Sequence, residues 1–284
     1  MEYPISYYNY KVIAILRYAC SRIYSRIAPN MQPLVIKSNP NFYRDMLIAI
    51  NDTCEFLQVN LIEFIRYLDE HSSWSDELWE KLNANADVYN RSIIGDYGKR
   101  NICANTISSF SLKYTSDTLY TVLGLVSNYN NNILLCDYGC CNANITISML
   151  LNGKTSYLAM HDYHTESTNL IEYRLNKHKM QANAQWHDIN DTADKFLYDV
   201  VYCTDVLEHT TNPSEILMNK LYLMIKPGGY LILQAPWGGD NKTHLDEAIV
   251  DFYGHSGRQF LKKNFKKIYS MTHLDISGVW RKNT

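Results

Sequence analysis

The second half of the chain alternates between two hydrophobic rhythms. Short apolar runs typical of buried strands are followed by segments in which apolar residues recur at helical spacing. We predict strands at residues 133–136, 156–160, 184–186, 200–203, 230–234, 267–271 and 277–281, and helices at residues 143–151, 168–177, 213–223 and 256–263. Strands that alternate with helices predict an α/β fold whose mostly parallel sheet is covered by helices on both faces.

The first half has helical spacing and few glycines. Apolar residues recur at every third or fourth position from Val12 to Ile27, and we expect this basic amphipathic segment to pack on its own domain rather than on a membrane. Four further helices are predicted at residues 42–57, 61–68, 74–82 and 116–127. Ser116 and Asp117 are expected to cap the last of these helices.

A polar segment lies between the helix predicted at residues 74–82 and the one predicted at residues 116–127. Residues 89–100 contain two glycines and few apolar positions, which predicts a loop or a lid. We therefore divide the chain into a helical lid or accessory subdomain at residues 1–115 and an α/β domain at residues 116–284.

The composition is that of an ordinary globular protein. The 284 residues are 46% hydrophobic with a formal net charge of −2, which gives no electrostatic case for a nucleic-acid partner. No apolar run reaches the roughly 18 to 20 residues of a membrane span, and the start lacks the pattern of a secretory signal. Seven cysteines without C-x-x-C spacing predict reduced thiols in a cytoplasmic protein, and 23 tyrosines are compatible with a homodimer surface.

The most informative segment reads Ile-Leu-Leu-Cys-Asp-Tyr-Gly-Cys-Cys-Asn-Ala, at residues 133–143. A parallel strand that ends at Asp137 would place this carboxylate in the crevice at the carboxyl edge of the sheet. Gly139 would then permit a sharp turn close to a ligand. This order predicts a nucleotide-type cofactor pocket, although an ordinary strand-to-helix turn has a similar sequence.

A second block, about sixty residues further on, supports the first. It contains Asp-Val-Leu-Glu-His at residues 205–209 and Ile-Lys-Pro-Gly-Gly-Tyr-Leu-Ile-Leu at residues 225–233. Together the two blocks resemble the class I S-adenosylmethionine-dependent methyltransferases, particularly the small-molecule subgroup, from about residue 131 to the end of the chain. The resemblance implies a Rossmann-like, mostly parallel sheet of seven strands. It also implies methyl transfer to an oxygen or nitrogen atom of a small molecule.

The resemblance further implies which residues bind S-adenosylmethionine. The family's first motif is an acid followed by three alternating glycines; Asp137 and Gly139 match it, whereas Cys141 and Ala143 replace the second and third glycines. Asp162 is expected to take the ribose hydroxyls, because a carboxylate accepts two donors. The complete cofactor set comprises Asp137, Tyr138, Gly139, Cys141, His161, Asp162, Asp188, Ile189, Thr204 and Asp205.

Catalysis and acceptor binding are expected at the same edge of the sheet. His209 is the expected general base, because an imidazole titrates near neutrality, and Asp205 is expected to assist it. The residues expected to contact the acceptor are Trp237, His244 and Tyr97.

Three alternatives remain open. Asp205, Glu208 and His209 stand at positions i, i+3 and i+4, which resembles the motif of metal-assisted RNA 2′-O-methyltransferases. His244 or His255 would supply a later ligand, although our assignment includes no metal ion. The two missing glycines also fit a methyltransferase-like scaffold without catalysis, and a use of the donor other than methylation would leave the same motifs.

Overall fold

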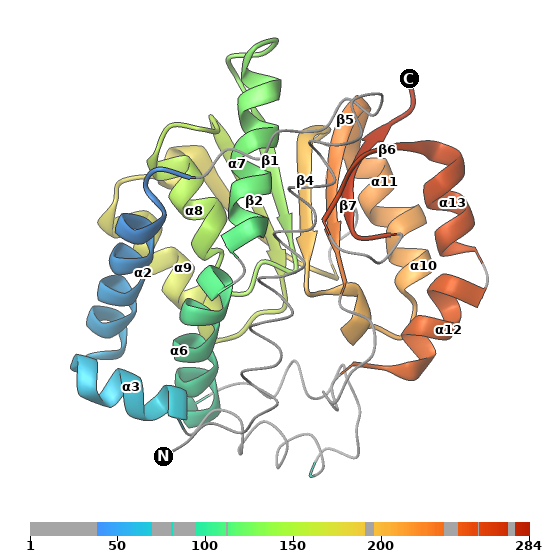
Figure 1. The fold of residues 1–284 in the computed structure, drawn as a ribbon. Coiled ribbons are helices and arrows are strands. Elements are labelled where there is room, and N and C mark those ends of the chain that lie inside the picture. The colour runs from blue at the N-terminus through green and yellow to red at the C-terminus, as the bar shows by residue number, and fades with distance from the viewer. Residues whose placement is uncertain are drawn as a thin grey trace, which may run out of the picture.

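Seven strands form one sheet in the computed structural model of the chain, in the order β3-β2-β1-β4-β5-β7-β6 (Figure 1). The structure describes residues 39–69, 81, 95–111, 113–190, 196–235, 244–254, 256–271 and 276–284. The strands are β1 Leu134–Tyr138, β2 Tyr157–Asp162, β3 Ala184–Asp188, β4 Tyr198–Thr204, β5 Ile225–Gln234, β6 Phe265–Ser270 and β7 Gly278–Lys282. Neighbouring strands are parallel except at β7, which runs antiparallel to β5 and β6. The predicted fold class, a mostly parallel seven-stranded sheet, is confirmed.

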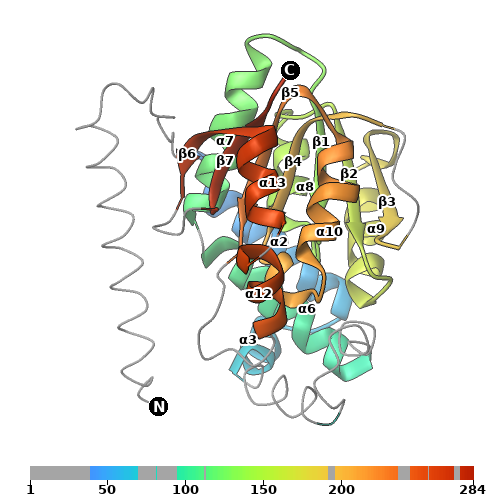
Figure 2. The same ribbon diagram turned by 90° about the vertical axis from the view of Figure 1, so that its right-hand side faces the viewer.

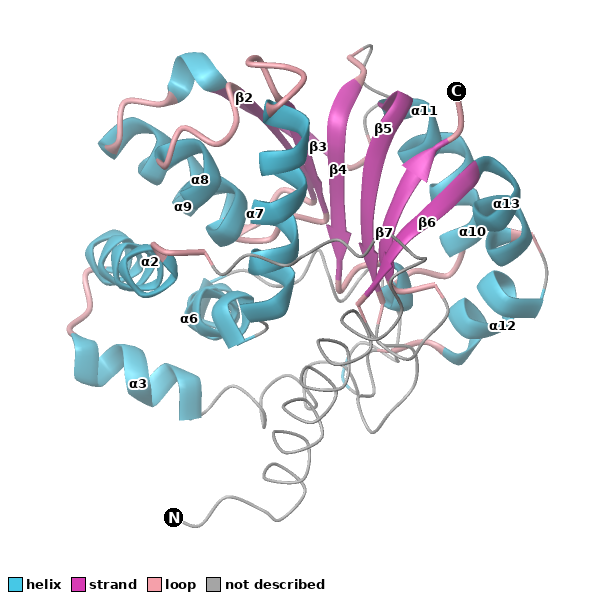
Figure 3. Cartoon of the chain, turned by 45° about the horizontal axis from the view of Figure 1, so that its top comes forward, coloured by secondary structure: helices cyan, strands magenta, loops and turns pink. Residues whose placement is uncertain are grey.

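Helices cover both faces of the sheet (Figures 2 and 3). On one face, Leu135 and Val200 join an apolar core with α7, α8 and α9. On the other face, Cys136 and Val201 join a second core with α10 to α13. Successive strand residues thus serve opposite cores, which is why the central strands read as continuous apolar runs. The helices beside the sheet are α7 Lys113–Ser127, α8 Asn144–Leu151, α9 Glu166–Lys177, α10 Pro213–Ile216, α11 Tyr222–Met224, α12 Asp246–Gly254 and α13 Gly257–Asn264.

Helices from the first half of the chain pack outside α8 and α9. They are α2 Phe42–Leu57, α3 Leu61–Asp69 and α6 Gly95–Ser111. α2 and α6 both contact α8 and α9, and α3 contacts α6. The boundary expected between residues 115 and 116 lies within α7, which packs directly on β4. Helices thus precede the sheet, as expected, and α7 crosses the expected boundary and packs on the sheet.

Three local predictions are wrong. Residues 95–100 form the first turns of α6 rather than a loop, and Gly98 is buried there. Ser116 and Asp117 lie inside α7 instead of capping it; Oδ1 of Asp117 accepts a hydrogen bond from the backbone N–H of Asn39 (2.8 Å). α12 occupies residues for which we predicted no helix.

Other predictions lie partly or wholly outside the described residues. The helix expected from Val12 to Ile27, most of the one expected at residues 74–82, and the polar loop after β5 are among them. Among the helices that the structure describes, none is long and apolar enough to cross a membrane. The six cysteines in the described ranges are free thiols, as predicted.

Candidate functional site

The strand order reverses between β1 and β4, and this reversal creates a crevice at their carboxyl ends. Gly139 leaves β1 with φ +72°, and its backbone N–H donates to the carbonyl of His161 at the end of β2 (2.8 Å). A Cβ atom on Gly139 would stand 2.3 Å from Cγ2 of Val206, which follows β4. The exits of the two strands therefore touch, and residue 139 must be glycine on both conformational and steric grounds. In open α/β sheets, ligands bind at such a switch point.

Asp137 lies in β1 and is buried beneath this crevice. Its Oδ2 accepts a hydrogen bond from the hydroxyl of Thr146 in α8 (2.6 Å). Burial raises the pKa of the Asp137 carboxyl to about 7; the hydrogen bond from Thr146 opposes this rise and the charge of Asp162 adds to it. Burial thus favours the protonated form of this carboxyl more than in an exposed aspartate.

Asp162 and Asp188 end the next two strands and are paired in register across the sheet. The backbone N–H groups of Cys141 and Tyr163 donate to the two carboxylate oxygens of Asp162 (2.5 and 2.7 Å). Burial raises the pKa of Asp162 to about 6. The two hydrogen bonds oppose this rise, and the charge of the nearby Asp188 adds to it. Ile189, the residue after Asp188, donates its N–H to the carbonyl of Asp162 (2.9 Å). The structure thus brings the expected ribose and adenine residues together at one edge.

Aromatic rings line the same strand ends. The rings of Tyr138 and His161 are stacked with centroids 6.0 Å apart, and those of His161 and His187 are 4.8 Å apart with an angle of 14°. These residues are cross-strand neighbours on β1, β2 and β3. Their alignment follows from the strand register, which holds side chains of neighbouring strands on one face.

The turn that replaces the family's glycines is left-handed at two residues that carry a side chain. Cys141 and Ala143 both have φ +48°. Burial raises the pKa of the Cys141 thiol to about 12, so this sulfur is protonated at neutral pH. The sulfur accepts a hydrogen bond from Nδ2 of Asn105 in α6 (2.9 Å).

The residues after β4 are arranged differently from the expected helical face. Asp205 is exposed with φ +59° and lies outside the single helical turn at Leu207–His209. Glu208 is completely buried, and both of its carboxylate oxygens have no hydrogen-bond partner. Burial, together with the charge of Asp205, raises the pKa of Glu208 well above its usual range. Asp205 therefore does not belong to a helical turn with Glu208 and His209, although its charge acts on Glu208.

His244, two residues before α12, lies close to Glu208 and His209. Its ring centroid lies 4.9 Å from that of His209. Within the described residues, Glu208, His209 and His244 each offer a ligand atom, and these atoms all lie within 4.8 Å of one another. A carboxylate with two imidazoles is a ligand set that suits a divalent metal.

The remaining expected site residues are more distant or undescribed. Tyr97 lies on α6, eight residues before Asn105, and a helix rises about 12 Å over that interval. Thr204 ends β4 beside the crevice. Trp237 and His255 lie outside the described residues.

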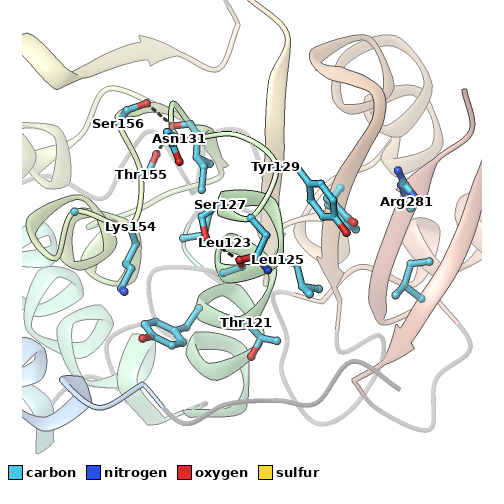
Figure 4. A pocket seen from close by; sticks show the side chains of 17 residues that line it. Thr121, Leu123, Leu125, Ser127, Tyr129, Asn131, Lys154, Thr155, Ser156 and Arg281 are labelled. Atoms are coloured by element: carbon cyan, nitrogen blue, oxygen red, sulfur yellow. Dashed lines mark hydrogen bonds between the residues drawn. The ribbon is translucent and has the colours of Figure 1, made fainter. Parts of the chain in front are cut away.

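Two cavities lined by described residues lie at the opposite, amino edge of the sheet. One of about 960 Å³ borders α7 and extends from Lys154 to Arg281 (Figure 4), and one of about 390 Å³ adjoins it at Tyr230. Neither cavity includes a residue of the β1–β4 crevice. The candidate site is defined by strand order and side-chain chemistry.

Comparison with known proteins identifies a family whose model matches this chain. Residues 118–276 match the model of a family described as a methyltransferase domain. The ubiquinone biosynthesis O-methyltransferase of Rickettsia prowazekii (strain Madrid E) is 28% identical over 136 residues, which cover 47% of this chain and 52% of that protein. The chain thus spans about half the length of the curated relative that it matches.

Solved structures that are similar to part of this chain include two bacterial proteins. An O-methyltransferase family protein from Burkholderia thailandensis is 13% identical, with a TM-score of 0.35, over 58% of this chain and 52% of that chain. The YcgJ protein from Bacillus subtilis is 12% identical, with a TM-score of 0.32, over 39% of this chain and 48% of that chain.

The sheet order and the crevice at its reversal define a Rossmann-like α/β domain. The family match covers more than half of the residues, and the chain belongs to the methyltransferase domain family. The resemblance inferred from the two sequence blocks is confirmed.

Proposed function

We propose that the protein is an S-adenosylmethionine-dependent methyltransferase that acts on an oxygen or nitrogen atom of a small molecule. The observation that carries the proposal is the pair of carboxylates, Asp162 and Asp188, in register at the crevice beside the Gly139 turn. The family match supports methyl transfer, and the relative named as an O-methyltransferase favours oxygen as the acceptor atom.

The residues at the crevice fit the groups of this donor. Asp162 has two carboxylate oxygens held in place by backbone N–H groups, with lone pairs left to accept ribose hydroxyls. Asp188 and Ile189 would contact the adenine, and the turn after Asp137 would lie along the methionine portion. Because Gly139 carries no side chain, Val206 can pack close to the turn at that residue.

The chain's part in the reaction would be positioning and proton transfer. When bound, S-adenosylmethionine supplies a methyl group already activated by its sulfonium. The crevice would hold the acceptor in line with that methyl group, which is the proximity contribution to rate. Thr204 and Asp205 would line the pocket near the transfer point, and an imidazole nitrogen of His209 would accept the proton that the acceptor atom loses as the new bond forms.

Calorimetry distinguishes this proposal from a scaffold without catalysis. The protein titrated with S-adenosylmethionine and with S-adenosylhomocysteine is expected to bind one molecule of either per chain. Absence of heat from both, at protein concentrations well above micromolar, would favour the scaffold. Mass spectrometry of products then separates methylation from any other use of the donor.

The pH dependence of binding tests the role of Asp162. Because burial raises its pKa to about 6, the carboxyl becomes protonated below that pH and accepts fewer hydrogen bonds. We expect affinity for S-adenosylmethionine to fall by up to about tenfold per pH unit below about pH 6, and to level off above it. The Asp162→Asn variant should bind weakly with little dependence on pH. Wild-type affinity that is constant from about pH 5 to about pH 8 would contradict the role.

The stability of the ligand-free protein is expected to change with pH in the opposite direction. Folded Asp137 and Asp162 hold protons that the unfolded chain has released, because burial raises both pKa values. The contribution of these two groups to the free energy of unfolding is thus present below about pH 4 and is lost as pH rises towards about 7. Urea unfolding measured over this range gives an independent check on the two raised pKa values.

Metal-assisted methyl transfer is a second candidate, favoured by the cluster of Glu208, His209 and His244. A buried carboxylate without hydrogen bonds must be neutralised either by a proton or by a cation. If a metal serves here, calorimetry with Mn²⁺ should show one binding site, and Glu208→Gln should remove it. Glu172→Gln, a change at an exposed acid, should leave the site intact. Activity that survives EDTA, with no heat from Mn²⁺, would leave the metal-free mechanism.

A further inference from the structure

The turn between β1 and α8 holds two residues in a conformation that side chains disfavour. Cys141 and Ala143 both have φ +48°, in the left-handed region where a Cβ atom costs free energy. The family motif has glycine at these two positions, and glycine adopts this conformation freely. Something else in this chain must therefore hold the turn in shape.

Asn142, between these two residues, supplies an anchor. Its side chain is almost completely buried, and its Nδ2 donates to the carbonyl of Ile102 (2.8 Å) and to Oγ1 of Thr106 (3.2 Å), both in α6. Asn105, on the same helix, donates to the sulfur of Cys141 (2.9 Å). Since a buried amide without partners is costly, the turn is strongly held in the one conformation that satisfies Asn142.

The helix that receives these bonds is itself fixed to the rest of the molecule. The hydroxyls of Thr106 and Thr53 are hydrogen-bonded (3.0 Å), which links α6 to α2. Arg174 in α9 is completely buried and donates from Nη1 to the carbonyl of Asn142 (3.4 Å) and to Oδ1 of Asn144 (2.9 Å). The turn is thus clamped between α6 and α9.

The clamp bears directly on the expected ribose ligand. The backbone N–H of Cys141, a left-handed residue of this turn, donates to Oδ2 of Asp162 (2.5 Å). A turn that shifts at Cys141 would withdraw this N–H and leave the carboxylate held by the N–H of Tyr163 alone.

We propose that Asn142 is a positioning residue, which takes the place of the missing glycines by anchoring the donor-binding turn to α6. It acts through Cys141 on the orientation of Asp162, so α6 forms a fixed part of the donor site rather than a lid over it. The inference rests on the proposed function, because its main consequence is tighter binding of S-adenosylmethionine.

The decisive experiment combines loss of the anchor with restoration of the glycines. Asn142→Ala is expected to weaken S-adenosylmethionine binding about tenfold, measured by calorimetry, with little change in kcat. Adding Cys141→Gly and Ala143→Gly to this variant should restore affinity to within about threefold of wild type, because the turn then needs no anchor. A purely structural role for Asn142 would not predict this rescue.

The matched control is Asn130→Ala. Asn130 also uses its side-chain amide in a part-buried hydrogen bond, to Asp199 at the amino edge of the sheet (3.3 Å). Its replacement should leave donor affinity unchanged. If Asn142→Ala does not fold, Thr106→Val removes the longer of the two acceptor contacts, together with the bonds of this hydroxyl to Thr53 and to the carbonyl of Ile102. It should give a smaller loss of donor affinity, and the same two glycines should reverse the part that arises at the turn.

Hydrogen exchange separates failure of this inference from failure of the proposed function. Wild-type protein that binds no donor would refute the function and leave the turn to be tested by exchange at the Cys141 amide. Faster exchange there in Asn142→Ala, with Asn130→Ala unchanged, would support the anchor. Unchanged exchange at Cys141, or unchanged donor affinity in Asn142→Ala, would overturn the inference, as would a loss of affinity that the two glycines fail to reverse.

Discussion

Gly139→Ala is expected to abolish measurable donor binding and to lower the free energy of unfolding by about 2 to 5 kcal/mol. The new Cβ would stand 2.3 and 2.8 Å from the two methyl carbons of Val206 and 3.1 Å from its Cβ. Val206 is buried and branched at Cβ, so it can yield only if the exit of β4 moves. The crevice would therefore lose its shape where the donor is expected to lie. Calorimetry with S-adenosylhomocysteine and urea unfolding measure the two effects.

Gly153→Ala provides a control with the same backbone cost. Gly153 has φ +62°, and a Cβ there would meet nothing within 4 Å. This variant should lose about 1 kcal/mol of stability and keep its donor affinity. Val206→Ala in the Gly139→Ala background should recover part of the loss, since it removes the two closest atoms. Equal effects of Gly139→Ala and Gly153→Ala on donor binding would contradict the steric explanation.

Arg174→Met is expected to destabilise the protein by about 3 kcal/mol, because the buried carboxylate of Asp52 loses its completely buried partner and keeps only the partly exposed Lys177 and His178. Nε of Arg174 lies 3.2 Å from Oδ2 of Asp52, and both side chains are inaccessible. Burial would raise the pKa of Asp52, but hydrogen bonds from Lys177 and His178 and the charge of Arg174 together hold it below its usual value. The pair joins α2 to α9 at the back of the donor turn. Chemical unfolding measures the loss.

The same substitution at an ion pair whose arginine is exposed is the control. Arg44 lies 3.4 Å from Asp45 with more than half of its side chain exposed, so Arg44→Met should change stability by less than about 1 kcal/mol. Adding Asp52→Asn to Arg174→Met should recover part of the loss, because the buried charge that has lost its buried partner is then absent. A loss at Arg174 no larger than that at Arg44 would show that the buried pair contributes nothing net.

The sheet was predictable because each strand carries a simple signal. Runs such as residues 200–203 are apolar on both faces, and their alternation with helices specifies a parallel sheet. Strand lengths were less predictable. β5 begins at Ile225, five residues before the predicted start. The prediction began later because Lys226, Pro227 and the two glycines are typical of a turn. The strand tolerates these residues because its pairing with β4 is irregular there.

α6 could not be predicted from an apolar stripe because it has none. It is joined to the turn and to α2 by hydrogen bonds of Asn105 and Thr106 rather than by a continuous hydrophobic face. Such polar packing has no period in the sequence. α12 did carry a signal, since Leu245, Ala248, Ile249 and Phe252 follow helical spacing, and a helix could have been predicted there.

In the candidate site, too, some residues could be predicted from the sequence and others could not. Asp137, Gly139, Asp162 and Asp188 were predictable because each ends or follows a strand whose neighbours are specified by the fold. Asn142 was missed, since its partners are a backbone carbonyl and a hydroxyl about 40 residues away. Its one signal was a polar amide within a turn where the family has small residues.

A crystal structure with S-adenosylhomocysteine tests the central claim most directly. The account predicts the adenosine at the carboxyl ends of β1 and β2, with ribose hydroxyls on Asp162, adenine beside Asp188 and Ile189, and the Asn142 amide still bonded to α6. Ligand density elsewhere, or a crevice closed by the side chains of Cys141 and Ala143 at saturating ligand, would contradict it.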